Sequence, residues 1–281
     1  MRPDRLAAHH FEAMGTSCAL FGVGIDRGEL VASELWVRRM AARLTRFSTD
    51  SEVARLNRAM GRWEDVSPEL EELLRASLSA FELSGGLVNI AVLPSMLAIG
   101  YGRPLSEGPT PATLGDALPS PPLPEVLTVR PGRARLARGC GIDLGGVAKG
   151  WMADRVLERM GSNALANLGG DLSARGAGPD GRGWPVGIAG QAVGLRDQGA
   201  ATSSVLRRRW GDLHHLIDPR TGLPSQSGLQ EVSVIARTAL EAEVIAKAAL
   251  LAGPDIAPAI CSVHALAWWF GASSPAPAGR T

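Results

Sequence analysis

Apolar residues recur at helical spacing in the first part of the chain. Between positions 31 and 47 they keep roughly to one face, which predicts a helix packed against a sheet. The residues on this face are Val31, Leu35, Met40, Leu44 and Phe47. A second helix is expected after Ser67 and Pro68, because serine is a favourable N-cap and proline suits the first helical position. The pair Gly85-Gly86 should end it.

The second half of the chain adds one more strong helix and several short strands. Thr238-Ala239-Leu240-Glu241 has the pattern of a capping box, so a helix should begin there and end before Gly253-Pro254. Residues 184–188 and 231–236 look like strands, and residues 125–129 and 133–137 look like a hairpin that leads towards position 142. The prolines between positions 103 and 124 exclude a continuous helix or a central strand there and indicate a surface connection.

A glycine-rich run at positions 141–151 carries the first candidate chemistry. Its first four residues read as a short strand, Gly145-Gly146 as a turn, and the residues from Val147 onward as a helix. Amides at a helix N-terminus favour phosphate. Lys149 lies in the first turn, where a positive charge is unfavourable for the helix dipole unless an anion shares the site. Asp143 offers a hydrogen-bond acceptor at the strand end. The competing interpretation is a plain strand-to-helix turn, because the run lacks the spacing of a Walker loop.

Length and composition serve mainly to exclude some classes of protein. The chain has 281 residues, of which 45% are hydrophobic, and a formal net charge of +1, so a large core is possible and no bias towards nucleic acid or membranes exists. We expect one domain over residues 1–270 and a disordered tail over 271–281. No apolar stretch near the N-terminus is long enough for a signal peptide, which favours a cytoplasmic location. Cys18, Cys140 and Cys261 form no CxxC pair and are expected to be reduced.

Several short motifs follow one another along the chain and together indicate a family. They are Ala13-Met14-Gly15-Thr16, the segment 50–57, the run 143–150, Asn167-Leu168-Gly169-Gly170-Asp171, Ala201-Thr202-Ser203-Ser204 and the segment 214–222. In this order, over roughly residues 11 to 253, the chain resembles the FAD:protein FMN transferases, the ApbE-type flavin transferases. The resemblance implies an α+β fold of the ApbE kind, similar to T-folds, with mixed or antiparallel sheets and packed helices. It also implies cleavage of FAD, release of AMP, and attachment of FMN through a phosphoester to a Thr or Ser hydroxyl of an acceptor protein.

The resemblance assigns roles to individual residues. His215, ahead of an Asp-Pro turn, is the expected catalytic base, since the ordinary pKa of histidine lies close to working pH; its neighbour His214 has no expected role. Lys149 and the amides after Gly145-Gly146 would hold phosphates. The expected cofactor-binding residues are Met14, Leu87, Val88, Asn89, Asp143, Lys149 and His215. The carbonyl of Gly146 and the side chain of Glu243 are the expected ligands of Mg²⁺.

Two positions depart from the pattern of the resembled family. That family carries an Asp and, four residues later, a Thr that help hold magnesium, whereas this chain has Glu243 and Lys247. In one interpretation these form an ordinary i,i+4 surface ion pair of about 0.3–0.5 kcal/mol, and Glu243 still ligates the metal. In the other, the ammonium of Lys247 replaces the ion. Asn89 stands where relatives usually carry Asp, so the hydrogen-bonding shape is kept and the negative charge is lost.

The sequence leaves other functions open. With water as the nucleophile, the same phosphate cradle would make an FAD pyrophosphatase that releases FMN and AMP. The altered positions would also suit a flavin-binding protein without catalysis, and the fold would also suit an unrelated group transfer. For the flavin transferase, the expected partners are FAD and an acceptor protein with a Thr or Ser site, without nucleic acid and without membrane insertion. The side chain that stacks on the flavin stays open between a tryptophan, Tyr101 and Met14.

Overall fold

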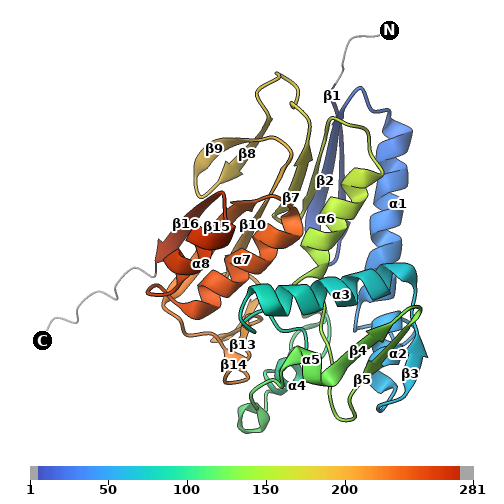
Figure 1. Cartoon of the computed structure of the whole chain (residues 1–281), viewed down its shortest axis with the longest axis vertical. Helices are drawn as coiled ribbons and strands as arrows, with labels where there is room; N and C mark the ends of the chain where they lie inside the picture. Colours follow the sequence, from blue (N-terminus) through green and yellow to red (C-terminus); the bar gives the residue numbers. More distant parts are fainter. Residues whose placement is uncertain (1–5, 273–281) are drawn as a thin grey trace, which may run out of the picture.

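The computed structural model describes residues 6–272, and its centre is a seven-stranded sheet (Figure 1). The strand order is β1-β2-β6-β7-β10-β15-β16, and every neighbouring pair is antiparallel. The strands are β1 (Leu6–Ala13), β2 (Thr16–Val23), β6 (Ala164–Leu168), β7 (Asp171–Arg175), β10 (Gln198–Ser204), β15 (Leu229–Ala236) and β16 (Ala267–Ala272). Met14 and Gly15 connect β1 to β2 with φ angles of 55° and 67°, as a tight two-residue hairpin turn requires.

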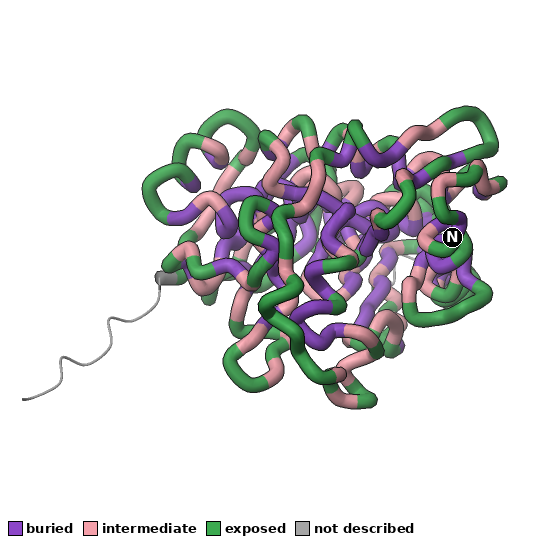
Figure 2. The backbone as a smooth tube through the Cα atoms, turned by 90° about the horizontal axis from the view of Figure 1, so that it is seen from below, coloured by how far each residue is buried: buried purple, intermediate pink, exposed green. Residues whose placement is uncertain are grey.

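Helices cover one face of this sheet. In sequence order, α1 packs on β1, α6 packs on β6 and β7, and α7 packs on β10 and β15, with α8 against α7 (Figure 1). These helices are α1 (Arg27–Leu44), α6 (Ala148–Glu158), α7 (Ala239–Ala252) and α8 (Ala257–His264). The main core lies between the helices and the sheet, and Leu20, Met40 and Met152 are fully buried in it. Figure 2 shows the buried segments gathered in the interior and the exposed ones in peripheral loops.

The opposite face of the sheet packs against the hairpin of β8 (Trp184–Ile188) and β9 (Gln191–Leu195). Successive side chains of a strand point to opposite faces, so Val234 of β15 belongs to the cluster with α7 while Ile235 belongs to the cluster with the hairpin. Trp184 contributes its buried ring and donates its indole N–H to the carbonyl of Arg175 at 3.0 Å. Both faces of the central strands are therefore covered.

A smaller sheet with the strand order β3-β5-β4 accompanies α2 and α3 beside the main layer (Figure 1). Its elements are α2 (Glu52–Arg58), β3 (Trp63–Asp65), α3 (Pro68–Leu83), α5 (Leu123–Val126), β4 (Leu127–Arg130) and β5 (Arg133–Leu136). The remaining elements are α4 (Leu93–Ala98), the 3₁₀ turns η1 (Leu105–Glu107) and η2 (Leu114–Asp116), and the short strands β11 (Arg209–Trp210), β12 (Leu213–His214), β13 (Ile217–Asp218) and β14 (Leu223–Pro224).

The helices predicted over 31–47, after Ser67 and after Thr238 are confirmed. Asp26 caps the first helix, which begins a turn earlier than expected and ends at Leu44. The hydroxyl of Ser67 accepts the amide of Leu70 at 3.2 Å, and that of Thr238 caps α7 in the same way. The strands over 184–188 and 231–236 and the absence of a continuous helix between 103 and 124 also agree with the structure. The predicted hairpin is present, but its first strand begins at Leu127 rather than at 125, because Leu123–Val126 form a short helix.

The strand predicted at 141–144 was wrong. This segment has no regular secondary structure and pairs with no strand among residues 6–272; instead, the side-chain amide of Asn57 holds Ile142 at both backbone groups, with distances of 3.0 Å and 2.8 Å. The amide of Asp143 donates to the carbonyl of Ile90 at 2.8 Å. A side chain from a distant helix thus supplies the hydrogen bonds that a neighbouring strand would supply.

The C-terminal boundary also needs correction. β16 extends to Ala272, so Gly271 and Ala272 belong to the main sheet rather than to the expected tail, and residues 273–281 lie outside the described part. The helix α8 was not predicted. Within residues 6–272, no helix combines the length and the hydropathy that a membrane crossing needs.

Candidate active site

Two adjoining cavities meet beside the start of α6. The larger has a volume of about 510 Å³ and the smaller of about 250 Å³. The larger volume lies in the usual range of small-molecule pockets, roughly 300–1,000 Å³. Both cavities are lined by Gly15, Gly145, Lys149, Arg208, His215, Leu216 and Lys247. We call the space bounded by these seven residues the junction, and it is rich in basic groups.

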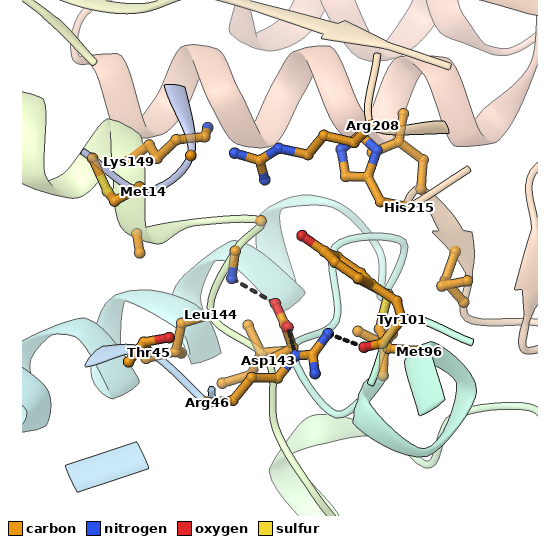
Figure 3. A pocket seen from close by; sticks show the side chains of 18 of the residues that line it. Met14, Thr45, Arg46, Met96, Tyr101, Asp143, Leu144, Lys149, Arg208 and His215 are labelled. Carbon is orange, nitrogen blue, oxygen red and sulfur yellow. Dashed lines mark hydrogen bonds and ion pairs between the residues drawn. The ribbon is translucent and has the colours of Figure 1, made fainter. Parts of the chain in front are cut away.

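The larger cavity is mostly apolar. Met14 reaches it from the β1–β2 turn and Tyr101 from the segment after α4 (Figure 3). Leu87 and Val88 line it from the loop after α3. The structure thus brings together three residues expected to bind the cofactor. Tyr101 also packs its ring against that of Trp210, with centroids 5.3 Å apart, and burial raises the pKa of its hydroxyl, so it remains a hydrogen-bond donor at neutral pH.

Asp143 holds the glycine turn in shape. One of its carboxylate oxygens accepts the Nε–H of Arg46, and the other accepts the amide of Gly145 at 2.7 Å. Arg46, whose side chain is 5% exposed, also donates to the carbonyl of Tyr101 at 2.5 Å (Figure 3). Asp143 lines the larger cavity, but its expected contact with the flavin nucleotide stays a prediction. Arg46 was missed because a lone arginine after a helix carries no motif.

Asn89 has a structural reason to be an amide. Its Nδ2 donates to the carbonyl of Pro121 at 2.9 Å, and its Oδ1 accepts the amide of Ala91 at 2.9 Å. A carboxylate could not donate to the carbonyl, so an ionised Asp would leave that bond unmade. The side chain therefore fastens the 87–92 loop, which lines the larger cavity, to the proline-rich connection.

Lys149 points to carboxylates of the protein itself. Its ammonium donates to Asp171 and, at 3.2 Å, to Glu243. Burial opposes the charge of Lys149, but the two carboxylates outweigh it and raise the pKa of the lysine. Burial raises the pKa of Asp171 to about 6 against the opposing effect of Lys149. The sequence motif that ends in Asp171 had suggested no role for this residue, and its role is to balance Lys149.

The N-terminus of α6 already has an anion. The Gly150 amide donates to Glu243 at 3.0 Å, and the amides of Val147 and Ala148 donate to the carbonyl of Leu144 at 3.0 Å and 2.9 Å. Carboxylates at helix N-termini are favourable for the same reason as phosphates. The buried Glu243 thus takes up one of the amides that the sequence had offered to a phosphate, and the phosphate contact at this helix stays a prediction.

The surface ion pair considered for Glu243 and Lys247 was wrong. The Glu243 side chain is 4% exposed and that of Lys247 is 13% exposed, and their charged atoms lie 3.5 Å apart. The ammonium of Lys247 points to the glycine turn, where it donates to the carbonyl of Gly146. Burial works against the charge of Glu243, but Lys149 and Lys247 outweigh it and lower its pKa. Lys247 is therefore part of the junction, and Glu243 lies beside it in the wall of the smaller cavity.

The expected magnesium ligands do not fit a divalent ion in this arrangement. The carbonyl of Gly146 accepts Lys247, and the two oxygens of Glu243 accept Lys149 and the Gly150 amide. Hard cations need free oxygen ligands and avoid neighbouring ammonium groups. Among residues 6–272, no group of three or more His, Cys, Asp and Glu side chains lies together in a way that would hold a metal.

The two adjacent histidines have different surroundings. Both ring nitrogens of His214 are used, since Nε2 bonds to the carbonyl of Ser225 at 3.0 Å and Nδ1 accepts the amide of Leu216 at 3.3 Å. His215 lines both cavities, and its buried Nδ1 has no hydrogen-bond partner among the described residues. Burial, followed by Arg208 and the two lysines, lowers the pKa of His215 well below 6.5, so the ring is neutral at pH 7. A neutral imidazole is able to accept a proton.

The segment after His215 is a turn that fixes this histidine against α7. The carbonyl of Asp218 accepts the amide of Gly222 at 2.8 Å, and the Asp218 carboxylate binds the guanidinium of Arg220. Arg220 in turn donates to the carbonyl of Leu251 at 2.9 Å, near the end of α7. The motif therefore has a structural role, as turn chemistry predicts.

Arg208 was not singled out from the sequence. It follows β10, lines both cavities, and has a φ angle of 47°, an uncommon conformation for a side-chain-bearing residue. Figure 3 shows its guanidinium between His215 and Lys149. No hydrogen bond or ion pair joins this guanidinium to another described residue, in contrast to Arg46, Lys149 and Lys247. Its position inside an arginine triplet gave no signal that distinguished it from its neighbours.

Comparison with known sequences gives the family. Residues 14–269 match the family described as the ApbE family. The chain belongs to this family. It is 30% identical to the FAD:protein FMN transferase of Salmonella typhimurium over an alignment of 262 residues. This alignment covers 83% of this ApbE chain and 74% of the relative. The FAD:protein FMN transferase of Escherichia coli is 30% identical over 249 residues, covering 80% and 71% of the two chains.

Solved structures of ApbE proteins have the same fold. The flavinyl transferase ApbE of Pseudomonas stutzeri matches with a TM-score of 0.82 and 22% identity, over 97% of this chain and 94% of that one. The ApbE protein of Thermotoga maritima matches with a TM-score of 0.83 and 24% identity, over 95% and 94%. These likenesses confirm the predicted α+β class with an antiparallel sheet and packed helices.

Proposed function

We propose that this ApbE protein is an FAD:protein FMN transferase. It cleaves the pyrophosphate of FAD, attaches FMN to a Thr or Ser hydroxyl of an acceptor protein and releases AMP. The observation that carries the proposal is the junction, where the neutral ring of His215 and the unpaired guanidinium of Arg208 line the same space. Relatives that are 30% identical over most of the chain and are named for this activity support it.

The shapes of the two cavities suit the parts of FAD. The larger, apolar cavity takes a flat aromatic ring, with Met14, Leu87 and Val88 among its walls. The junction takes the pyrophosphate, because Arg208 offers a charge that no carboxylate of the described residues balances and Lys247 lines the same space. The smaller cavity is lined by polar residues such as Thr202, Ser203 and Ser204 and leaves room for a second polar reactant.

His215 is the base of the proposed reaction. Its neutral ring accepts the proton of the attacking hydroxyl, the hydroxyl oxygen forms a bond to the phosphorus of the FMN half, and the bond to the AMP oxygen breaks. Arg208 stabilises the negative charge on the phosphoryl oxygens. A bound pyrophosphate also offsets the nearby cations that, after burial, lower the pKa of His215, so binding of FAD raises this pKa towards the range of an efficient base.

The proposal also includes the domain, the cofactor and the partner of the reaction. Residues 6–272 act as one domain, the cofactor is FAD, and the partner is an acceptor protein with a Thr or Ser site. No nucleic acid takes part.

The test compares the two histidine variants after incubation with FAD. AMP release is followed by chromatography, and protein-bound flavin by fluorescence in denaturing gels of a cell lysate supplemented with the enzyme. We expect His215→Gln to lose both signals with FAD affinity changed less than about threefold, because a base acts in the transition state. His214→Gln should keep turnover and lower stability, since it breaks two buried hydrogen bonds.

The outcomes separate the alternatives. AMP with free FMN and without protein-bound flavin would indicate a pyrophosphatase. Tight FAD binding without AMP release would indicate a flavin-binding protein. No binding of FAD would overturn the proposal, and greater loss of turnover in His214→Gln than in His215→Gln would overturn the assignment of the base.

A further inference from the structure

The chain contains two lysines, Lys149 and Lys247, although Lys and Arg together number 29. The other 27 of these residues are arginines, and both lysines meet the same carboxylate, that of Glu243. Lysine carries a compact point charge, whereas arginine carries a planar, delocalised one. The only two compact side-chain cations of the sequence therefore lie in one buried cluster at the junction.

Lys247 occupies a place suited to a small cation. Its ammonium donates to the carbonyl of Gly146 and lies 3.5 Å from an oxygen of Glu243. Carbonyl and carboxylate oxygens are the ligands that hard metal ions prefer. A Cβ atom built on Gly146 would come within 3.0 Å of the ammonium nitrogen, so the lysine fills the space beside the glycine turn.

The charges of the cluster are already balanced. Asp171 and Glu243 provide two carboxylates, and Lys149 and Lys247 provide two ammonium groups. A divalent ion at the Gly146 carbonyl would replace the Lys247 contact and would lie against two positive charges. It would also compete for Glu243, whose two oxygens accept hydrogen bonds from Lys149 and the Gly150 amide.

We propose that the ammonium of Lys247 serves as the cation of this site in place of a divalent metal ion. FAD then binds and is cleaved without added metal. This inference rests on the proposed function and specifies how the pyrophosphate charge is balanced. Lys247 lines both cavities, so its ammonium is able to contact phosphate oxygens at the junction while it remains anchored to Gly146 and Glu243.

The first experiment measures FAD affinity and AMP release for the wild-type chain and two variants, in EDTA and in Mg²⁺. The wild-type values should agree within about twofold between the two conditions. Lys247→Thr and Lys247→Met should both weaken FAD binding in EDTA on the order of ten- to a hundredfold, the effect of losing a charge-assisted contact. Mg²⁺ should restore binding in Lys247→Thr, which offers an oxygen ligand, and should not restore it in Lys247→Met, which offers none.

The second experiment uses Mn²⁺ alone as a probe, with its binding followed by electron paramagnetic resonance. The wild-type chain should bind no Mn²⁺ at millimolar concentration, and Lys247→Thr should bind it. Circular dichroism and thermal melting of each variant check that the fold is intact. If Lys247→Thr fails to fold, two wild-type measurements still decide whether the lysine replaces a metal ion. They are the comparison of FAD binding and AMP release in EDTA and Mg²⁺, and the Mn²⁺ titration.

Failure of this inference differs from failure of the proposed function. Loss of FAD binding or AMP release from the wild-type chain in EDTA, with recovery in Mg²⁺, overturns the replacement and leaves the transferase proposal standing. Specific Mn²⁺ binding by the wild-type chain also overturns it. No FAD binding in either condition overturns the transferase proposal and this inference with it.

Discussion

Arg208 shows how a single side chain can matter because it lacks a partner. The neighbouring carboxylates of Asp171 and Glu243 already pair with the two lysines, so the guanidinium of Arg208 is the charge left for a ligand. Its backbone lies at a positive φ, which usually costs free energy and is often retained at functional sites. The conformation turns the side chain into the space between the two cavities.

We therefore expect Arg208→Gln to weaken FAD binding on the order of ten- to a hundredfold, the loss of a charge-assisted phosphate contact. Binding of riboflavin, which has no phosphate, should change less than about twofold. Fluorescence titrations with both ligands measure the two effects. Arg209→Gln is the matched control, because Arg209 is exposed and lines neither cavity, and it should bind both ligands like the wild type. Equal losses for FAD and riboflavin would assign Arg208 a general structural role.

For single residues, the sequence predicted which side chains line the cavities better than it predicted their hydrogen-bond and ion-pair partners. Met14, Leu87, Val88, Lys149 and His215 do line the cavities. The partners of each side chain depend on residues that are distant in the chain, and no local pattern shows them. Asn89 is an example, since its amide is explained by a carbonyl 32 positions away.

Among the elements, α7 decides the geometry of the junction, because it carries both Glu243 and Lys247 one turn apart. Its N-terminus is fixed by the carboxylate of Asp154 in α6, which accepts the amides of Ala239 at 2.9 Å and Leu240 at 3.0 Å. The hydroxyl of Ser173 donates to the same carboxylate at 2.7 Å. One side chain thus joins two helices and the central sheet.

Asp154→Ala should lower the free energy of unfolding by about 2–3 kcal/mol, since it removes a partly buried acceptor of three hydrogen bonds and leaves the two helical amides without it. Urea denaturation measures the change. Arg237→Ala, at an exposed i,i+4 ion pair beside the same helix start, is the control and should stay within about 0.5 kcal/mol of the wild type. A loss for Asp154→Ala no larger than that of the control would contradict this role.

Elements with their own start and stop signals were predictable, and elements that depend on tertiary contacts were not. The helices α3 and α7 carry N-cap residues in the sequence, and both begin where those residues indicate. Residues 141–144 have the composition of a strand, yet the side chain of Asn57 takes the place of a neighbouring strand. The caps are local, whereas the Asn57 contact spans 85 residues.

For the whole molecule, the buried histidines make stability depend on pH. Burial lowers the pKa of His214, and burial with Arg208, Lys247 and Lys149 lowers that of His215 well below 6.5. The unfolded chain therefore binds protons on these rings at a pH where the folded chain does not. Their stabilising contribution is complete above about pH 6.5 and is lost as the pH falls from there towards the lowered pKa values.

The free energy of unfolding should accordingly decrease on acidification by up to about 1.4 kcal/mol per pH unit for each ring. Urea denaturation at about pH 7.5, 6.5 and 5.5 measures the slope. His215→Gln should reduce the slope, because glutamine does not titrate. An unchanged slope in this variant would show that His215 does not contribute to the acid dependence.

The burial of the two junction lysines also determines how readily a lysine-specific protease cleaves this protein. An endoprotease specific for lysine has two cleavage sites in the sequence, after Lys149 in α6 and after Lys247 in α7, and both lie on packed helices with side chains that are at most 15% exposed. The folded chain should therefore resist this enzyme, although exposed arginines leave it open to trypsin. Cleavage into residues 1–149, 150–247 and 248–281 should follow the opening of the fold, and FAD should slow it by stabilising the folded state. Digestion by this protease thus reports unfolding and ligand binding without any label on the protein.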